Sequence, residues 1–220
     1  MRDGGKLREA LLEFFFPSRC CFCRRLTRNG TAVCRECGKR YPDRPRGQCE
    51  RLLDRSLRCL SPLRYDGDVR RALLRYKFGG ATSCAPVLAC FMQKCLDESG
   101  ISCDSITWVP LSAKRLRSRG YDQARLLAEA LAKAEGLPCL PLLKKTRHTV
   151  AQSGLRTREQ RQRNAEGAYC ALDPAGIKGR RILLVDDIVT SGATLRECAR
   201  MLRRAGAASV TAITAASRDT

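Results

Sequence analysis

The sequence predicts an α/β domain preceded by a small cysteine-rich module. From Tyr65 onward, amphipathic segments with helical spacing alternate with short apolar runs, which is typical of helices packed on a β-sheet. The first sixty or so residues are instead rich in Cys and Arg and poor in long periodic segments. A chain of 220 residues holds one ordinary domain and a small accessory module. We therefore expect a module at residues 1–60 and a domain at residues 61–220.

The spacing of apolar residues predicts the main elements of the domain. Helices are expected at residues 69–78, 85–97, 122–135 and 193–205, and strands at residues 105–109, 168–172, 181–185 and 210–215. The alternation of the two kinds of element indicates a layered arrangement of helices on a sheet.

The first seventeen residues carry apolar side chains at helical spacing. Leu7, Leu11, Phe14 and Phe15 predict a docking helix, and acidic residues within the same stretch argue against a secretory signal. The sequence has no apolar run of the roughly 18 residues that a membrane span needs. We therefore expect a cytoplasmic protein whose 14 cysteines are free or metal-bound.

The charge balance is strongly positive. The chain has 42 Lys and Arg against 22 Asp and Glu, which gives a formal net charge of +20. Such a surface attracts phosphate-bearing partners, and many of the arginines are clustered. The competing interpretation is that the positive charge only keeps the protein soluble and binds no particular partner.

Two cysteine pairs near the N-terminus have the spacing of a structural zinc site. Cys20 and Cys23 form one pair, and Cys34 and Cys37 form the other, with ten residues between the pairs. Two such knuckles bring four thiolates around one tetrahedral ion, and a closed site of this kind stabilises a small module without taking part in catalysis. Cys21 is an alternative ligand, and incidental buried cysteines are the competing interpretation.

The remaining cysteines do not form further pairs of this kind. Cys49 and Cys59 each lack a partner at the required spacing, so a second zinc site is not expected. Seven others lie in apolar segments and are expected in the core: Cys84, Cys90, Cys95, Cys103, Cys139, Cys170 and Cys198.

The stretch from residue 182 to residue 194 is the most informative part of the sequence. An apolar strand ends at two adjacent acids, Asp186 and Asp187, which can accept hydrogen bonds from vicinal ribose hydroxyls in the crevice of an open sheet. The following loop, Thr190, Ser191, Gly192, Ala193 and Thr194, opens a helix and offers hydroxyls and backbone amides to a monophosphate.

The same stretch has features in common with two kinds of site that do not bind a ribose phosphate. An apolar strand ending in acids also occurs in P-loop ATPases, but the sequence has no Gly-x4-Gly-Lys-Ser/Thr motif. Thr190 or Ser191 could act only as the N-cap of the helix, but capping alone does not call for two acids.

Residues 182–194 resemble the phosphoribosyl-diphosphate (PRPP) signature of type I phosphoribosyltransferases at every position. The flanking segments extend the resemblance to the ComF family, bacterial competence-associated proteins that join a cysteine zinc ribbon to such a domain. The segments that carry it are the cysteine pairs after Phe16-Pro17 and residues 75–80, 109–111, 115–124, 149–155 and 161–164. This chain departs from the family in lacking a second pair of knuckles and in having Asp122 in place of an asparagine.

The resemblance implies a parallel sheet flanked by helices and a ligand site on it. Asp186 and Asp187 would hold the ribose hydroxyls, residues 190–194 would hold the 5′-phosphate, and Mg²⁺ would bridge ribose and pyrophosphate. The pyrophosphate would contact the loop after Val109, which consists of Pro110, Leu111 and Ser112. It would also contact four nearby basic residues: Lys77, Arg115, Arg117 and Arg119.

A second basic cluster precedes the strand expected at residues 168–172. It consists of Lys144, Lys145, Arg147, Arg156, Arg158, Arg161 and Arg163. Arginine binds pyrophosphate and nucleic-acid phosphates equally well, so this cluster is a candidate for either. Few aromatic residues lie within it, which disfavours base stacking. A solvated charged loop is the competing interpretation, and His148 is expected to be exposed.

Three functions fit these features. The first is a PRPP-binding protein that acts in DNA uptake and natural transformation, binds single-stranded DNA and has competence-machinery proteins as partners, as the ComF resemblance implies. The second is an active phosphoribosyltransferase, although Thr190 stands where related purine-salvage enzymes carry an acid that serves as general base. The third is a zinc-dependent DNA-binding adaptor whose nucleotide loop is vestigial.

Overall fold

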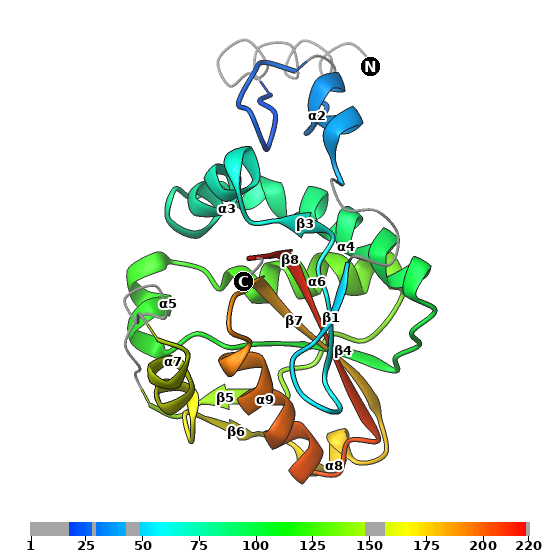
Figure 1. Ribbon diagram of the computed structural model, residues 1–220, viewed down its shortest axis with the longest axis vertical. Coiled ribbons are helices and arrows are strands. Elements are labelled where there is room, and N and C mark those ends of the chain that lie inside the picture. Colours follow the sequence, from blue (N-terminus) through cyan, green and yellow to red (C-terminus); the bar gives the residue numbers. More distant parts are fainter. Residues whose placement is uncertain (1–17, 28–29, 43–48, 148–156, 219–220) are drawn as a thin grey trace, which may run out of the picture.

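The structure, a computed structural model, describes residues 18–27, 30–42, 49–147 and 157–218. The helix expected at residues 1–17 lies outside the described residues, as do His148 and Arg156, and the side chain of Arg158 is also not described. Figure 1 shows the cysteine-containing segment at one end of the molecule, next to α3 (Gly67–Phe78) and α4 (Ala85–Ser99). Along the described part of the chain, no helix combines the length and apolar character that crossing a membrane requires.

A six-stranded, mostly parallel sheet forms the centre of the molecule. Its strands run in the order β1 (Glu50–Leu52), β2 (Arg58–Leu60), β8 (Ser209–Ser217), β7 (Arg181–Val189) and β4 (Ser105–Trp108), and β3 (Leu63–Arg64) also pairs with β8. Among the described pairings of this sheet, only β1–β2 is antiparallel. The hairpin β1–β2 lies within the range expected for the N-terminal module but hydrogen bonds into the sheet of the domain.

The alternation of side chains along β7 divides the core into two halves. Leu183 and Val185 pack with the core beneath α3, α4 and α6 (Gln123–Glu135), whereas Ile182 and Leu184 pack with the core beneath α9 (Ala193–Arg204). All four side chains are essentially inaccessible to solvent, as expected for a parallel strand covered on both faces. Figure 1 shows these two helical layers on opposite sides of the sheet.

Smaller elements surround the layer that contains α9. The short helix α8 (Pro174–Ile177) and the antiparallel hairpin β5 (Leu143–Lys145) and β6 (Tyr169–Ala171) contribute to the same core. The helix α7 (Arg158–Ala165) packs against α9, and α5 (Ala113–Arg119) follows β4.

The expected helices and strands are present, with three informative differences. The strand expected to end at Val185 continues to Val189, because Asp186, Ile188 and Val189 remain paired with β8. The polar segment at residues 158–165 is a helix that begins with a capping box between Thr157 and Gln160. The spacing of apolar residues did not predict this helix, because the segment is almost entirely polar. Cys90 is exposed and Cys170 is half-buried rather than part of the core, whereas Cys103 and Cys139 are half-buried against it.

Candidate functional site

The four cysteines with zinc-site spacing come together in the structure. The Sγ atoms of Cys20, Cys23, Cys34 and Cys37 all lie within 4.8 Å of one another. The first pair is in a turn closed by hydrogen bonds between residues 20 and 24–25, and the second pair begins the short helix α2 (Arg35–Arg40). Cys21 is not part of this cluster, because its thiol is hydrogen bonded to Cys84.

The protonation of these thiols fits a bound cation. Burial raises the pKa of Cys20, but hydrogen bonds with the backbone of Cys34, Cys23 and Phe22 outweigh it and lower the pKa to about 7. Burial and the neighbouring thiols raise the pKa of Cys37. Four crowded sulfur atoms therefore resist full deprotonation unless a dication compensates their charge, and tetrahedral zinc with four thiolates satisfies this requirement.

The cysteine module is packed firmly on α3 and α4. The ring of Phe22 lies between those of Tyr41 and Phe91, with centroid distances of 4.5 Å and 5.8 Å. Arg75 of α3 donates hydrogen bonds from Nη2 to the carbonyl oxygens of Cys21 and Phe22, at 2.9 Å and 2.8 Å. The position of α3 is therefore tied to the backbone that carries two of the four clustered cysteines.

A large cleft lies at the carboxyl ends of β7 and β4, with a volume of about 810 Å³. Its lining contains seven Lys and Arg side chains against two Asp, so its field favours an anionic ligand. The lining includes much of the predicted site, namely Asp186, Asp187, Thr190, Ser191, Gly192, Ala193, Thr194, Pro110, Leu111, Lys77, Arg115 and Arg119. Lys145 and Arg161, predicted as nucleic-acid contacts, line the same cleft.

Asp187 forms an ion pair with α3. Its Oδ2 lies 2.9 Å from Nζ of Lys77, and only 4% of the Asp187 side chain is exposed. A buried carboxylate is costly without a cationic partner, so this pair fixes the end of α3 against β7. Lys77 stands two residues after Arg75, so one helix links the four-cysteine cluster to the floor of the cleft.

Asp186 lies on the opposite side of the same strand. Burial raises the pKa of its carboxyl group, and the charge of Asp187 raises it further. The negative charge of Asp186 acts to raise the pKa of Lys145 and that of Tyr169, both in the β5–β6 hairpin. Two acids in this environment favour a ligand that donates hydrogen bonds or brings a cation.

Arginines hold the loop at residues 190–194 from outside the cleft. Arg51 of β1 donates from Nη2 to the carbonyl oxygen of Thr190, and Arg196 of α9 donates from Nη1 to that of Ser191 at 2.9 Å. Because C=O and the following N–H point in opposite directions in a trans peptide, this arrangement turns the amides of Ser191 and Gly192 toward the cleft that both residues line. These amides precede the N-terminus of α9 and can bind a phosphate.

Position 192 requires glycine. Its φ of +73° lies in the left-handed region, and a Cβ there would stand 2.7 Å from Cδ2 of Leu53. The β1–β2 hairpin, which carries Leu53 and Arg51, therefore shapes the loop directly.

Lys145 and Tyr169, which come from the β5–β6 hairpin, form one wall of the cleft. Nζ of Lys145 donates a hydrogen bond to the Tyr169 hydroxyl at 3.0 Å. Burial lowers the pKa of Lys145 to about 8, with a further contribution from the charge of Arg115. The wall thus presents a cation that loses its proton slightly above neutral pH.

Several predicted site residues do not line the cleft. Ser112 is buried and caps α5, where its Oγ accepts from the amide of Arg115. The other described residues of this kind are exposed and face elsewhere: Arg117, Lys144, Arg147 and Arg163. Asp122 accepts hydrogen bonds from the amides of Ala124, Arg125 and Leu111, which connects the start of α6 to the loop after β4. These three amides account for the acid at position 122.

Sequence reasoning missed part of the lining. The structure adds Tyr65, Arg70, Phe78, Tyr121, Gln123, Tyr169 and Arg218. Phe78 and Tyr121 fall within segments that carry the family resemblance, so a signal that could have identified them is present in the sequence.

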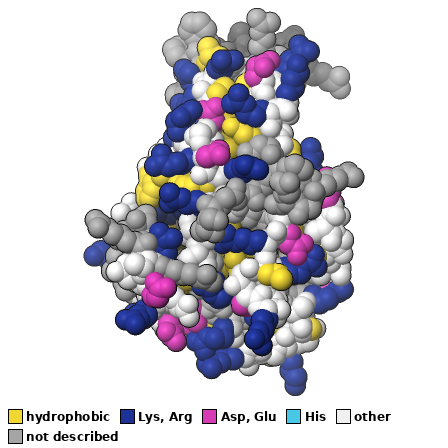
Figure 2. All heavy atoms as spheres, in the orientation of Figure 1, with side chains coloured by type: hydrophobic (Ala, Val, Ile, Leu, Met, Phe, Trp, Pro, Cys, Tyr) yellow, Lys and Arg dark blue, Asp and Glu magenta, His cyan; other side chains and the backbone are white. Residues whose placement is uncertain are grey.

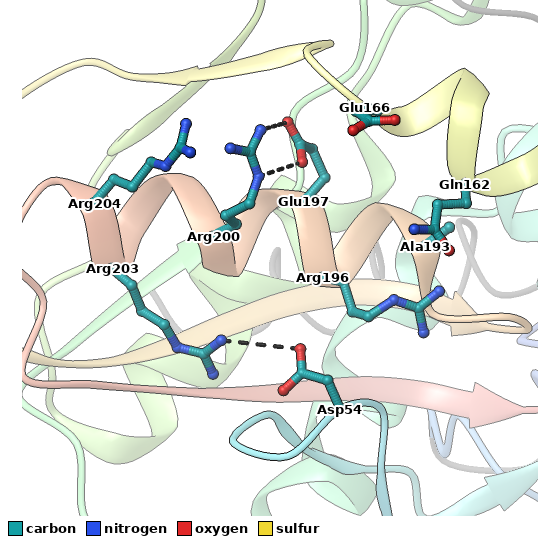
Figure 3. A pocket seen from close by; sticks show the side chains of 9 residues that line it. All are labelled: Asp54, Gln162, Glu166, Ala193, Arg196, Glu197, Arg200, Arg203 and Arg204. Carbon is teal, nitrogen blue, oxygen red and sulfur yellow. Dashed lines mark hydrogen bonds and ion pairs between the residues drawn. The ribbon is translucent and has the colours of Figure 1, made fainter.

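A second hollow, of about 510 Å³, lies along the outer side of α9 (Figure 3). Four arginines line it, but three acids lie beside them. Glu197 accepts two hydrogen bonds from Arg200, and Asp54 lies 3.9 Å from Arg203. These ion pairs neutralise most of the positive charge of the hollow. The cleft, with its excess of cations, is therefore the better anion site.

The sheet, the acids on β7 and the loop that follows define a type I phosphoribosyltransferase-like domain. A family model described as the phosphoribosyl transferase domain matches residues 118–220. Among solved structures, the glutamine PRPP amidotransferase of B. subtilis, complexed with ADP and GMP, is 24% identical with a TM-score of 0.43. That match covers 64% of this chain and 30% of the other.

Curated relatives identify the family. DNA utilization protein YhgH of Salmonella typhimurium is 31% identical over 201 residues, which cover 87% of this chain and 86% of that protein. Competence protein F of Haemophilus influenzae is 36% identical over 104 residues, or 47% of this chain and 45% of that protein, so the match spans less than half of the relative. Competence protein ComFC of Streptococcus pneumoniae is 31% identical over 146 residues, 66% and 62% of the two chains. The chain belongs to the ComF family.

The metal site is tested by a single thiol replacement. Cys34→Ser removes one of four clustered ligands, so we expect the zinc content to fall from one ion per chain to a small fraction and the melting temperature to fall. Metal analysis and thermal unfolding measure both. Cys90→Ser, which alters an exposed cysteine outside the cluster, is the control and should change neither. Equal zinc content in the two variants would contradict this assignment.

The cost of burying Asp186 is tested by Asp186→Asn. The raised pKa means that the native state is destabilised as pH rises and the carboxyl group ionises. The neutral amide avoids this penalty, so the melting temperature at pH 8 should increase by roughly 3–5 °C per pKa unit of the shift. The gain should shrink as pH falls toward the ordinary carboxyl range. Asp97→Asn, on the exposed side of α4, is the control, and a lower melting temperature for Asp186→Asn at pH 8 would refute the prediction.

Proposed function

We propose that this chain is a PRPP-binding, phosphoribosyltransferase-like protein that acts in DNA uptake and natural transformation through binding of single-stranded DNA. The observation that carries the proposal is the cleft, which combines two acids, a phosphate loop and an excess of cations in one volume. A ligand that fits must present hydroxyls to the acids and phosphates to the loop and the cations. A phosphorylated ribose with a pyrophosphate group has this distribution.

In this proposal each part of the cleft meets one part of PRPP. Asp186 and Asp187 accept the ribose hydroxyls, and the loop at residues 190–194 holds the 5′-phosphate. Lys77, Arg115 and Arg119 lie nearest the pyrophosphate. Mg²⁺ would neutralise the pyrophosphate and the acids, and the raised pKa of Asp186 supports a site that a hard, oxygen-binding cation would relieve. The zinc cluster has a structural role only.

The role in DNA uptake is supported by the relatives. Their names refer to competence and to DNA utilization, and the net charge of +20 suits a polyanionic partner. Figure 2 shows Lys and Arg side chains distributed over much of one face of the molecule. Competence-machinery proteins as partners and a cytoplasmic location belong to the same proposal.

An active phosphoribosyltransferase is the second candidate, and one observation favours it. The cleft continues past the loop to Lys145 and Tyr169, which leaves room for an acceptor next to the ribose site. Lys145, with a pKa near 8, is in part neutral at physiological pH and could accept a proton there. This candidate requires release of pyrophosphate when PRPP and an acceptor are supplied together.

Calorimetric titration with PRPP and Mg²⁺ tests the proposal. We expect saturable binding to the zinc-loaded protein and its loss in the Asp186→Ala, Asp187→Ala double variant, because both hydroxyl acceptors are then missing. Asp97→Asn is the control and should bind as the wild type does. Absence of PRPP binding, with single-stranded DNA still bound, would instead support an adaptor with a vestigial loop.

The pH dependence of binding tests the role of the Lys145 wall. Lys145 is charged below its pKa of about 8 and neutral above it, so affinity for an anionic ligand should fall as pH rises through this value. We expect about a tenfold loss, because a hydrogen bond to a charged group contributes about 1.5 kcal/mol. Lys145→Arg keeps the charge and should flatten the profile, as measured by PRPP affinity across this range. An unchanged profile in that variant would exclude Lys145 as the titrating group.

A further inference from the structure

The mouth of the cleft exposes an aromatic ring that the fold does not need. Phe78, the last residue of α3, lines the cleft, and 70% of it is exposed, which is the largest exposed fraction among the exposed large hydrophobic residues described. Because it both lines the cleft and faces solvent, its ring stands at the entrance. A large exposed apolar side chain beside a ligand cleft is typical of a contact surface.

One face of this ring is already used. The guanidinium of Arg119 lies over the Phe78 ring, 4.8 Å from its centroid. Arg119 is itself held by a hydrogen bond to Oε1 of Gln123 at the start of α6. The ring is thus supported from one side on a fixed cation, and most of its remaining surface is open. This is a rigid platform on which a second planar group can stack.

Three further cations line the same cleft as Phe78. They are Arg70 of α3, Arg161 of α7 and Arg218, which directly follows β8. Tyr121 also lines the cleft, and its hydroxyl is hydrogen bonded to the carbonyl oxygen of Tyr76. Stacking surfaces among cations are the combination that binds single-stranded nucleic acid, because the rings hold the bases and the cations hold the phosphates.

We propose that the cleft mouth is the docking site for single-stranded DNA, with one base stacked on Phe78 and its neighbouring phosphates held by Arg70, Arg161 and Arg218. The inference rests on the proposed function and adds the place where the strand binds. It adds Phe78 to Tyr121 as a candidate stacking surface, whereas the sequence alone offered few aromatic residues within the basic segments and disfavoured base stacking. The charge balance of the lining argues for DNA rather than an apolar partner.

A single strand fits this site better than a duplex. In a duplex the bases are stacked on each other, and the face of a base becomes available to a protein ring only when it is unstacked. The strand would lie above the acids and the phosphate loop, which form the floor of the same cleft. PRPP and DNA would therefore be neighbours, and each should alter the affinity of the other.

The experiment measures binding of a labelled oligothymidine and of an otherwise identical strand with abasic sites. We expect Phe78→Ala to weaken oligothymidine binding about tenfold, since removal of one stacking ring has effects of this size. Phe78→Trp should restore binding. On the abasic strand, wild type and Phe78→Ala should bind alike, because no base remains to stack. Leu172→Ala, at another exposed apolar side chain away from the cleft, is the matched control.

The outcomes separate this inference from the proposed function. If wild type binds the oligothymidine and Phe78→Ala binds it equally well, the platform is wrong while the proposed function stands. Equal loss on the abasic strand would mean that Phe78 does not stack on a base, and equal binding of duplex DNA would also overturn the inference. If the wild type binds PRPP but no single strand, both this inference and the DNA part of the proposed function fail. Binding of neither ligand would reject the proposed function as a whole.

Discussion

The ion pair between Lys77 and Asp187 is the interaction on which the arrangement of the cleft depends. Asp187 is almost fully buried at the end of β7, and a carboxylate in such a place needs a cation within reach. The ion pair therefore fixes the position of the C-terminal turn of α3. The same turn places Phe78 at the cleft mouth. Arg75, earlier on this helix, is hydrogen bonded to the backbone between Cys20 and Cys23 of the four-cysteine cluster. The cysteine module therefore supports the cleft through α3, although none of its described residues lines the cleft.

The two acids of the cleft have different surroundings because they are neighbours on a strand. Asp187 faces α3 and its lysine, whereas Asp186 faces the β5–β6 hairpin and carries a raised pKa. Keeping Asp186 in this position costs stability, and functional sites often retain such costs. The loop at residues 190–194 is likewise held in place by the protein, since Arg51 and Arg196 donate hydrogen bonds to its carbonyl oxygens. The floor of the cleft is thus arranged before any ligand arrives.

Local sequence signals predicted the fold well and the cleft in part. The apolar run of β7, the adjacent acids and the loop before α9 are contiguous in sequence, so their grouping could be read directly. The same holds for the paired cysteines, whose spacing alone brought them together correctly. The position of Lys145 could not be read in this way, because the hairpin that turns it into the cleft pairs residues some twenty-five positions apart. The roles of Arg51 and Phe78 likewise depend on contacts between distant segments. Charge patterning alone predicted Arg117 and Lys144 as ligand contacts, but neither residue lines the cleft.

In the proposed function, the floor of this cleft binds a ribose phosphate through β7 and the loop that follows it. Hydrogen–deuterium exchange of the zinc-loaded protein, with and without PRPP and Mg²⁺, measures this most directly because it reports on individual backbone amides. We expect strong added protection at residues 186–194 and in the last turn of α3, with little change along the outer face of α9. Protection confined to α9, or none at all at saturating PRPP, would contradict it.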